Sequence, residues 1–287
     1  MSCEYQLYLP SGYGVKSARK WPLVIFLHGS GGGDTIEAVT RNGLPWLAAR
    51  YPSLPFVLVS PRGTMRRGWG NALPMLNAML DEIIAKYKID PDRVYLTGQS
   101  LGGIGTYAWC SANPERFAAA VPICGNARNQ NLDQMRGIPV WAFHGAKDAA
   151  VPVGLAVTTV DALKQASGDA QLTIYPEVDH ASWVPAYNTP ELYAWMLRHR
   201  RDEGKVIEGP EEALPQAFLD DLGFERLCVA LAFDDVKSAT NLAEGMTFSL
   251  PLKNATSRPI RAALTWDTAT NPAWTVTPTD STGQLAN

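Results

Sequence analysis

Hydrophobic and polar residues alternate in two patterns over the first 200 residues of the chain. Short, continuously apolar runs such as Trp21–Leu27 (WPLVIFL) and residues 55–60 (PFVLVS) are typical of strands buried on both faces. Between them lie longer segments with apolar residues at every third or fourth position, as in residues 73–88, which is helical spacing. Strands that alternate with helices predict right-handed βαβ units and a mostly parallel sheet covered by helices.

The same two patterns set the expected bounds of the other elements. We expect further strands at residues 4–9 (at the sheet edge), 93–97, 117–123, 138–143 and 171–175. We expect further helices at residues 42–50, 104–111, 131–136, 153–165 and 190–200. The predicted fold class over this part of the chain is therefore α/β.

The pattern changes near residue 200. Residues 198–212 are charged and contain glycines and a proline, a composition typical of a linker. Beyond residue 217 only short apolar runs follow, separated by turn residues, which predicts a small all-β, sandwich-like module. We therefore expect an α/β domain at 1–203, a linker at 204–216 and the β module at 217–287. The module has about 70 residues against about 100 in a full sandwich, so we expect it to be truncated.

Composition and charge exclude several classes of protein. The chain has 287 residues, of which 46% are hydrophobic and 18% charged, and its formal net charge is -3. A weakly acidic chain does not favour nucleic acid as a partner, and no apolar stretch approaches the roughly 20 residues of a membrane span. The first residues lack the basic start and the apolar segment of a signal peptide. We expect a cytoplasmic protein as the sequence stands, and a secreted one if a leader has been lost.

The four cysteines are Cys3, Cys110, Cys124 and Cys228, and they show neither a C-x-x-C pair nor metal-ligand spacing. We interpret Cys110 and Cys124 as small buried hydrophobic residues. We expect no disulfide framework, no metal and no cofactor.

One short segment combines the strand and helix patterns with reactive chemistry. Residues 98–102 read Gly-Gln-Ser-Leu-Gly and lie between the strand at 93–97 and the helix at 104–111. Such a turn between a strand and a helix is a nucleophile elbow, which exposes the serine hydroxyl at the carboxyl end of the sheet. We therefore expect Ser100 to be a nucleophile; the alternative is a chance Gly/Ser turn.

A serine hydroxyl needs a general base, and three of the four histidines follow Ser100, as the chain order Ser, acid, His requires. His199 lies among arginines at the end of a predicted helix, so we expect it at the solvated surface. His144 directly follows the strand at 138–143. His180 lies in the loop after the last predicted strand, which hangs over the same sheet edge as Ser100. We expect His180 to be the base.

The base in turn needs a carboxylate that orients it. Asp148 lies four residues after His144, in the loop after a strand, and is placed to reach His180. The rival is Asp179, whose side chain should point away from a ring one residue along the chain. We expect Asp148 to be the acid.

The oxyanion of acyl transfer needs backbone N–H donors aimed at it. One should be the N–H of Leu101, at the start of the helix after Ser100, where the helix dipole helps. The other should come from residues 28–31, the HGSG loop after the first buried strand. This loop has the form of an esterase HGGG-type motif. We choose the N–H of Ser30, with Gly29 and Gly31 as alternatives. A phosphate-binding loop is the competing interpretation, but no Lys-Ser/Thr follows the glycines.

Together these motifs resemble the α/β-hydrolase superfamily, and more narrowly the esterases grouped with polyhydroxybutyrate depolymerases, feruloyl esterases and "predicted peptidase" esterases. The resemblance is carried by YLP at 8–10, WPLVIFLHG at 21–29, DPDRVY at 90–95, GQSLGG at 98–103, PERFAA at 114–119, HGAKDAAVP at 144–152, and His180. It spans about two thirds of the chain. It implies an α/β-hydrolase fold and carboxylic ester hydrolysis by Ser100, Asp148 and His180. The secreted depolymerases differ in having a cysteine pair near the active loops, which argues against a polymer substrate here.

Three residues are expected to contact the substrate. Trp69 and Trp183 are predicted near the catalytic edge of the sheet, where they would line an acyl or alcohol pocket by flat apolar contact, with core packing as the alternative. Gln99, inside the elbow, is the third. The segment between residues 117 and 138 has no insertion long enough for a lipase lid, and an open site favours short or aromatic acyl groups.

The sequence therefore predicts a serine carboxylesterase that acts on small, short-chain or aryl esters, including esters derived from plant cell walls. A feruloyl, acetyl-xylan or polyester-type depolymerase is the alternative within the same class. A serine peptidase and a non-catalytic binding protein are the competing classes.

Overall fold

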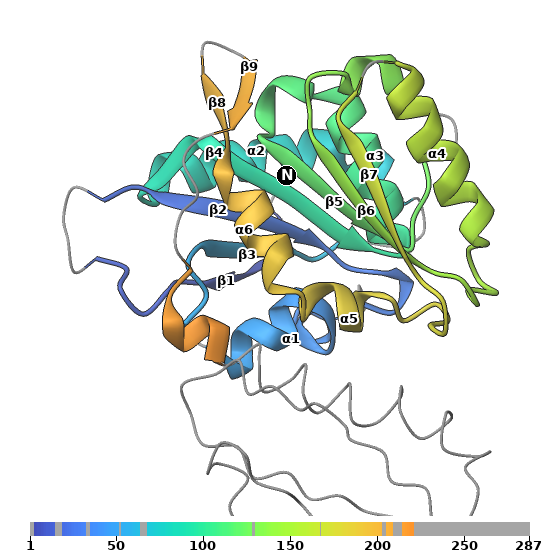
Figure 1. Cartoon of the computed structure of the whole chain (residues 1–287). Coiled ribbons are helices and arrows are strands. Elements are labelled where there is room, and N and C mark those ends of the chain that lie inside the picture. Colours follow the sequence, from blue (N-terminus) through green and yellow to red (C-terminus); the bar gives the residue numbers. More distant parts are fainter. Residues whose placement is uncertain are drawn as a thin grey trace, which may run out of the picture. The chain divides into compact units, whose positions relative to one another are not determined.

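The computed structural model describes residues 3–14, 19–32, 35–51, 53–63, 68–127, 130–166, 168–202, 205–208 and 214–220. The chain divides into two compact units, Met1–Phe218 and Leu219–Asn287. The strands predicted for the β module, together with Cys228, lie outside the described residues. Figure 1 shows the helices and strands of the first unit with their labels.

A seven-stranded sheet forms the centre of this unit, with strand order β1-β3-β2-β4-β5-β6-β7. The strands are β1 Tyr5–Tyr8, β2 Trp21–Leu27, β3 Val57–Pro61, β4 Ile89–Gln99, β5 Ala119–Ile123, β6 Val140–Gly145 and β7 Ala170–Tyr175. The edge strand β1 runs antiparallel to β3, and the other pairs are parallel. This is the mostly parallel sheet that the sequence predicts.

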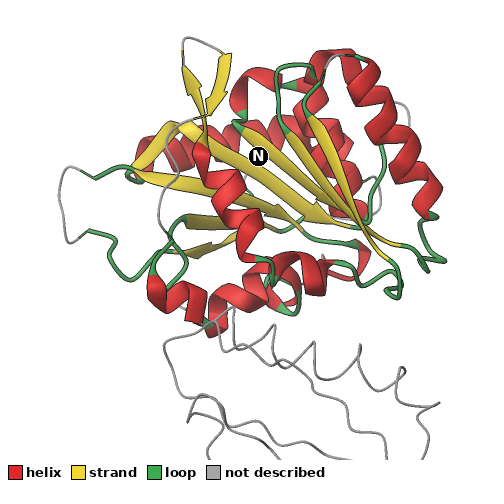
Figure 2. Ribbon diagram, viewed as in Figure 1, coloured by secondary structure: helices red, strands yellow, loops and turns green. Residues whose placement is uncertain are grey.

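Helices cover both faces of the sheet (Figure 2). They are α1 Gly43–Arg50, α2 Leu73–Lys86, α3 Leu101–Ala112, α4 Val153–Gln165, α5 Trp183–Tyr187 and α6 Pro190–Arg198. In Figure 1, α1, α5 and α6 lie in front of the sheet, and α2 and α3 lie behind it. Within the described residues, no helix is both long and apolar enough to cross a membrane.

Side-chain alternation along the central strands explains this layering. Leu23, Ile25 and Leu27 of β2 are fully buried in one hydrophobic core together with residues of α2 and α3. Phe26, between them, points to the opposite face, where its ring contacts Tyr187 of α5 at 6.1 Å between centroids. A strand with both faces covered needs apolar residues at every position, and β2 has them.

The predicted and observed elements agree closely, with differences at short segments. Residues 131–136 hold a 3-10 turn, Leu132–Met135, in place of a short helix, and α5 was not predicted. The last helix ends at Arg198, and a hairpin of β8 (His199–Asp202) and β9 (Lys205–Glu208) follows, so β9 lies in the predicted linker.

The expectation that His199 is a surface residue is wrong. The side chain is 1% exposed, and its Nδ1 donates a hydrogen bond to the carbonyl of Trp195 at 2.7 Å. Its ring packs edge-on against the Trp195 indole. The neighbouring arginines suggested solvent, but His199 begins a strand in which alternate side chains turn inward.

Candidate active site

Ser100 occupies a sharp turn between β4 and α3. Its backbone has φ 55° and ψ −118°, a left-handed conformation that costs about 1–3 kcal/mol for a residue with a side chain. The turn requires glycine at position 102, because a Cβ there would lie 1.8 Å from the carbonyl oxygen of Leu27. The N–H of Ser100 donates to the carbonyl of Ile123 at 2.9 Å and lies 3.2 Å from the Sγ of Cys124. The predicted strand–turn–helix context of Ser100 is therefore present.

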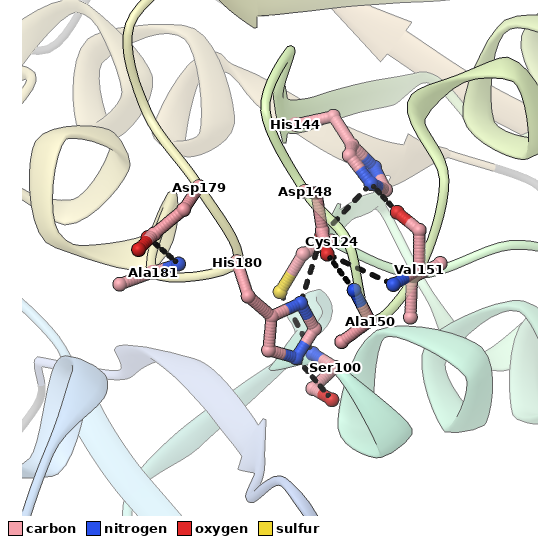
Figure 3. A network of polar contacts seen from close by, with 9 residues as sticks. All are labelled: Ser100, Cys124, His144, Asp148, Ala150, Val151, Asp179, His180 and Ala181. Carbon is pink, nitrogen blue, oxygen red and sulfur yellow. Dashed lines mark hydrogen bonds and ion pairs between the residues drawn. The ribbon is translucent and has the colours of Figure 1, made fainter.

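The loops after β6 and β7 bring an acid and a histidine to this serine (Figure 3). His180 Nε2 lies 2.8 Å from the Oγ of Ser100, and His180 Nδ1 lies 2.7 Å from the Oδ2 of Asp148. Because Oδ2 only accepts, Nδ1 carries the proton and Nε2 faces the hydroxyl as an acceptor. These are the three residues that the sequence analysis grouped together.

The Asp148 carboxylate is held rigidly away from solvent. Its Oδ1 accepts hydrogen bonds from the N–H groups of Ala150 and Val151 at 2.9 and 2.8 Å, and its side chain is fully buried. Burial alone would raise the pKa of Asp148, but the hydrogen bonds from Val151, His180 and Ala150 outweigh it and keep the pKa below its ordinary value. The carboxylate is therefore ionised at neutral pH.

Asp179, the rival acid, is placed differently. Its carboxylate is exposed and accepts a hydrogen bond from the N–H of Ala181 at 3.0 Å. Figure 3 shows it turned away from the His180 ring. The geometry therefore pairs His180 with Asp148.

Contacts between the two loops fix the distance between the acid and the histidine. The N–H of Lys147 donates to the carbonyl of Val178 at 2.9 Å, and the Lys147 ammonium pairs with Glu177 at the surface. Beneath them, a Cβ on Gly145 would lie only 2.0 Å from the carbonyl oxygen of Asp179. Gly145 therefore lets the loop that carries His180 cross directly over the end of β6.

The HGSG loop lies beside Ser100. A Cβ on Gly29 would be 3.4 Å from the Cβ of Ser100. The buried ring of His28 holds this loop: its Nδ1 lies 2.7 Å from the carbonyl oxygen of Gly29, and its Nε2 accepts from the N–H of Gly63 at 3.1 Å. Because Nε2 accepts, Nδ1 carries the proton and donates to Gly29. Burial lowers the pKa of His28, which favours this neutral form.

The three predicted substrate contacts have different surroundings. Trp183 is partly buried beside His180. Trp69 is 2% exposed and belongs to the core, which was the alternative: its indole N–H donates to the carbonyl of His28 at 3.0 Å. Gln99 is also 2% exposed, and its amide donates to Asn42 at 2.7 Å. Tertiary hydrogen bonds draw both Trp69 and Gln99 inward, whereas Trp183 keeps part of its surface exposed.

Cys110 and Cys124 are buried free thiols, as predicted. Burial raises the pKa of Cys124 to about 12, so the thiol stays protonated at neutral pH. Sequence reasoning did not foresee that Cys124 adopts φ 41° directly beside the N–H of Ser100. It also did not foresee the contacts of His28 and His144 with the functional loops.

Known proteins resemble this chain in sequence and in fold. Residues 62–192 match the family model described as the Dienelactone hydrolase family. A solved structure described as a thermostable esterase superposes with a TM-score of 0.62 at 30% identity, over 69% of this chain and 59% of that chain. The chain has the α/β-hydrolase fold. In this chain, the turn at Ser100 lies at the carboxyl end of the central strand β4, where this fold carries its nucleophile elbow.

Two curated relatives are named esterases. A bifunctional acetylxylan esterase/xylanase of Neocallimastix patriciarum is 29% identical over 150 residues, which is 50% of this chain and 21% of that protein. A probable feruloyl esterase C of Aspergillus terreus is 27% identical over 172 residues, which is 58% of this chain and 62% of that protein. The chain thus spans less than two thirds of the length of each.

Proposed function

We propose that this hydrolase is a serine carboxylesterase that cleaves short-chain or aryl carboxylic esters through an acyl-enzyme. The observation that carries the proposal is the unbroken line of contacts from Ser100 Oγ through His180 to Asp148, at 2.8 and 2.7 Å. The order of a hydroxyl, an imidazole and a carboxylate along this line is the one that nucleophilic catalysis needs. The two esterase relatives support the same class of reaction.

In the proposed reaction, the Oγ of Ser100 attacks the ester carbonyl carbon while Nε2 of His180 takes the hydroxyl proton. The bond from carbon to the alcohol oxygen then breaks, and His180 returns the proton to that oxygen. A water molecule then attacks the acyl-enzyme in the same way, and the carboxylic acid is released from Ser100. Asp148 holds the Nδ1 proton of His180 throughout and stabilises the imidazolium that forms in each step.

The proposed oxyanion donors are the N–H groups of Leu101 and Ser30. Leu101 is the first residue of α3, where backbone N–H groups have no partner within the helix. The carbonyl of Gly29 accepts from the His28 ring and from the N–H of Gly32 at 3.1 Å. In a trans peptide the next N–H points the opposite way, so the N–H of Ser30 is turned away from His28. Gly29 and Gly31 remain the alternative donors.

Short or aromatic acyl groups fit this site best. The described part of the segment between β5 and β6 contains a 3-10 turn, Leu132–Met135, where a lipase would carry a lid. The partly exposed ring of Trp183 offers a flat apolar surface next to His180. Feruloyl esters, whose acyl group carries an aromatic ring, are the proposed natural class, and acetylated xylan and polyesters are the alternatives.

A panel of substrates tests the reaction class. The full-length protein and Ser100→Ala are assayed on p-nitrophenyl acetate, methyl ferulate, acetylated xylan, poly(3-hydroxybutyrate) and a peptide anilide. We expect turnover of the first two, loss on the order of 10⁴-fold in Ser100→Ala, and fluorophosphonate labelling of the native protein only. Faster cleavage of the anilide than of the esters would indicate a peptidase, and absence of labelling would contradict the proposal.

A matched pair of variants tests the acid. Asp148→Asn should lower kcat about 10⁴-fold because the ring of His180 then adopts the wrong tautomer. Asp179→Asn, one residue from His180 but turned away from it, should lower kcat far less, because the Asp179 carboxylate is exposed and bonds to the N–H of Ala181. The opposite ranking would assign the acid to Asp179.

A further inference from the structure

A second histidine contacts the carboxylate of Asp148. His144, near the end of β6, has a fully buried side chain, and its Nε2 lies 3.2 Å from the Oδ2 of Asp148. The same Nε2 lies 2.8 Å from the carbonyl oxygen of Val151. Figure 3 shows His144 and His180 on opposite sides of the Asp148 carboxylate. The proposed mechanism uses only His180.

The partners of the His144 ring determine its tautomer. A carbonyl oxygen only accepts, so Nε2 carries a proton and donates it to Val151. Within the described residues, the other ring nitrogen, Nδ1, is buried and has no hydrogen-bond partner. Asp148 Oδ2 therefore faces the polar N–H edge of the His144 imidazole.

Val151 links the two side chains into a closed ring of contacts. Its N–H donates to the Oδ1 of Asp148 at 2.8 Å, and its carbonyl accepts from His144. Both peptide groups of Val151 are thus tied to side chains, and His144 connects the turn to strand β6 of the sheet. A rotation of the Asp148 carboxylate would break the Val151 contact and move Oδ2 against the His144 ring.

We propose that His144 is a positioning residue for the acid: it anchors the turn at Val151 and keeps the Oδ2 of Asp148 directed at His180. This inference rests on the proposed roles of Asp148 and His180. His144 itself touches no reacting atom, and its effect on the rate passes through Asp148. If His144 only filled the core, its replacement would lower the stability of the protein. The effect of that replacement on the rate would then be the same with and without Asp148.

Three variants of the full-length protein separate these roles. Glutamine places an amide N–H near the position of Nε2, whereas asparagine is too short and phenylalanine has no donor. We expect His144→Gln to keep kcat on p-nitrophenyl acetate within about threefold, and His144→Asn and His144→Phe to lower it about tenfold with KM unchanged, the order expected for one buried hydrogen bond. His199→Phe, an equally buried histidine bonded to Trp195, is the control and should leave kcat unchanged.

A double-mutant cycle provides the decisive measurement. The rate of fluorophosphonate labelling of Ser100 is measured for His144→Phe in the native background and in an Asp148→Ala background. We expect about tenfold slower labelling in the first and less than about twofold in the second. Equal losses in both backgrounds, or a change in Tm without a change in rate, would overturn the proposal. If Ser100→Ala and Asp148→Asn kept their activity, the proposed function itself would fail, which is a separate outcome.

Discussion

The indole of Trp183 stands perpendicular to the imidazole of His180, with the two ring centroids 5.6 Å apart. Trp183 begins α5, and its side chain is partly exposed. The edge-to-face contact supports one side of the His180 ring, and the partly exposed indole offers apolar surface next to that ring. A planar aryl group of a substrate can pack on that surface.

Replacing this side chain should therefore affect aryl esters selectively. We expect Trp183→Ala to raise KM for methyl ferulate about tenfold, since an aromatic contact contributes about 0.5–1.5 kcal/mol beyond its buried area. Because p-nitrophenyl esters carry an aryl leaving group, ethyl butyrate is the matched non-aryl substrate, and its KM should change less than about threefold. Trp183→Phe should restore most of the selectivity. Equal changes in KM for both esters would place the aryl group elsewhere.

The close crossing at Gly145 leads to a second prediction. A methyl group there would lie 2.0 Å from the carbonyl of Asp179 and 2.4 Å from that of Val178, so the loop must shift. We expect Gly145→Ala to lower kcat by about 100-fold, because small displacements of catalytic groups cost this much. Tm should also fall. Kinetics on p-nitrophenyl acetate and a thermal melt measure both effects.

Gly154 is the matched control for that substitution. It lies in the first turn of α4, and a Cβ there would meet nothing within 4 Å. Gly154→Ala should leave kcat unchanged and raise stability by about 0.5–1 kcal/mol, because alanine loses less entropy in a helix. If Gly145→Ala behaved like Gly154→Ala, the loop that carries His180 would be more adaptable than its contacts indicate.

The sheet and the order of the reactive residues could be predicted because each depends on local sequence. The apolar run of β2 and the helical spacing of α4 give their bounds to the residue. The elbow, the acid and the histidine each follow a recognisable strand, and parallel strands bring their carboxyl ends to one edge. No knowledge of packing is needed for that inference.

The parts that were missed depend on contacts between distant residues. The short helix α5 has five residues, one of them Pro185, so it shows no helical period. Trp69 becomes buried because its indole bonds to His28, 41 positions away. The contact of His144 with Asp148 is local, but the spacing alone does not show which way a buried ring turns. These contacts depend on the direction of each side chain, and sequence patterns carry the least information about that direction.

His28 offers a test of the oxyanion loop. Asparagine can place its amide N–H near the position of Nδ1 and keep the hydrogen bond to the carbonyl of Gly29, whereas glutamine cannot. We expect His28→Gln to lower kcat about 100-fold, the cost of losing one oxyanion donor, with little change in KM. His28→Asn should keep kcat within about tenfold.

A transition-state mimic distinguishes this effect from a general distortion. A trifluoromethyl ketone forms a tetrahedral adduct with Ser100, and the stability of this adduct depends on the oxyanion donors. Binding of the substrate in its ground state does not depend on them. Its inhibition constant should rise in His28→Gln by the same factor by which kcat falls. An inhibition constant that stayed constant while kcat fell would contradict the role of this loop in holding the oxyanion.

Phe218 gives a prediction about where the folded α/β unit ends. The sequence suggests a boundary at residue 203, but Phe218 is fully buried, and its ring packs edge-on against Tyr193 of α6 at 4.9 Å between centroids. Tyr193 in turn stacks on Phe56. A chain that ends at residue 203 would leave this aromatic cluster open to water and should be less soluble than one that ends at residue 220.

In the full-length protein, Phe218→Ala should lower stability by about 3–5 kcal/mol, the usual cost of emptying a buried phenylalanine site. Because Phe218 touches none of the proposed catalytic residues, kcat on p-nitrophenyl acetate should stay within about twofold. Chemical denaturation and steady-state kinetics on the same preparation measure both quantities; a stable Phe218→Ala variant with a reduced kcat would mean that this segment shapes the site and does not merely close the core.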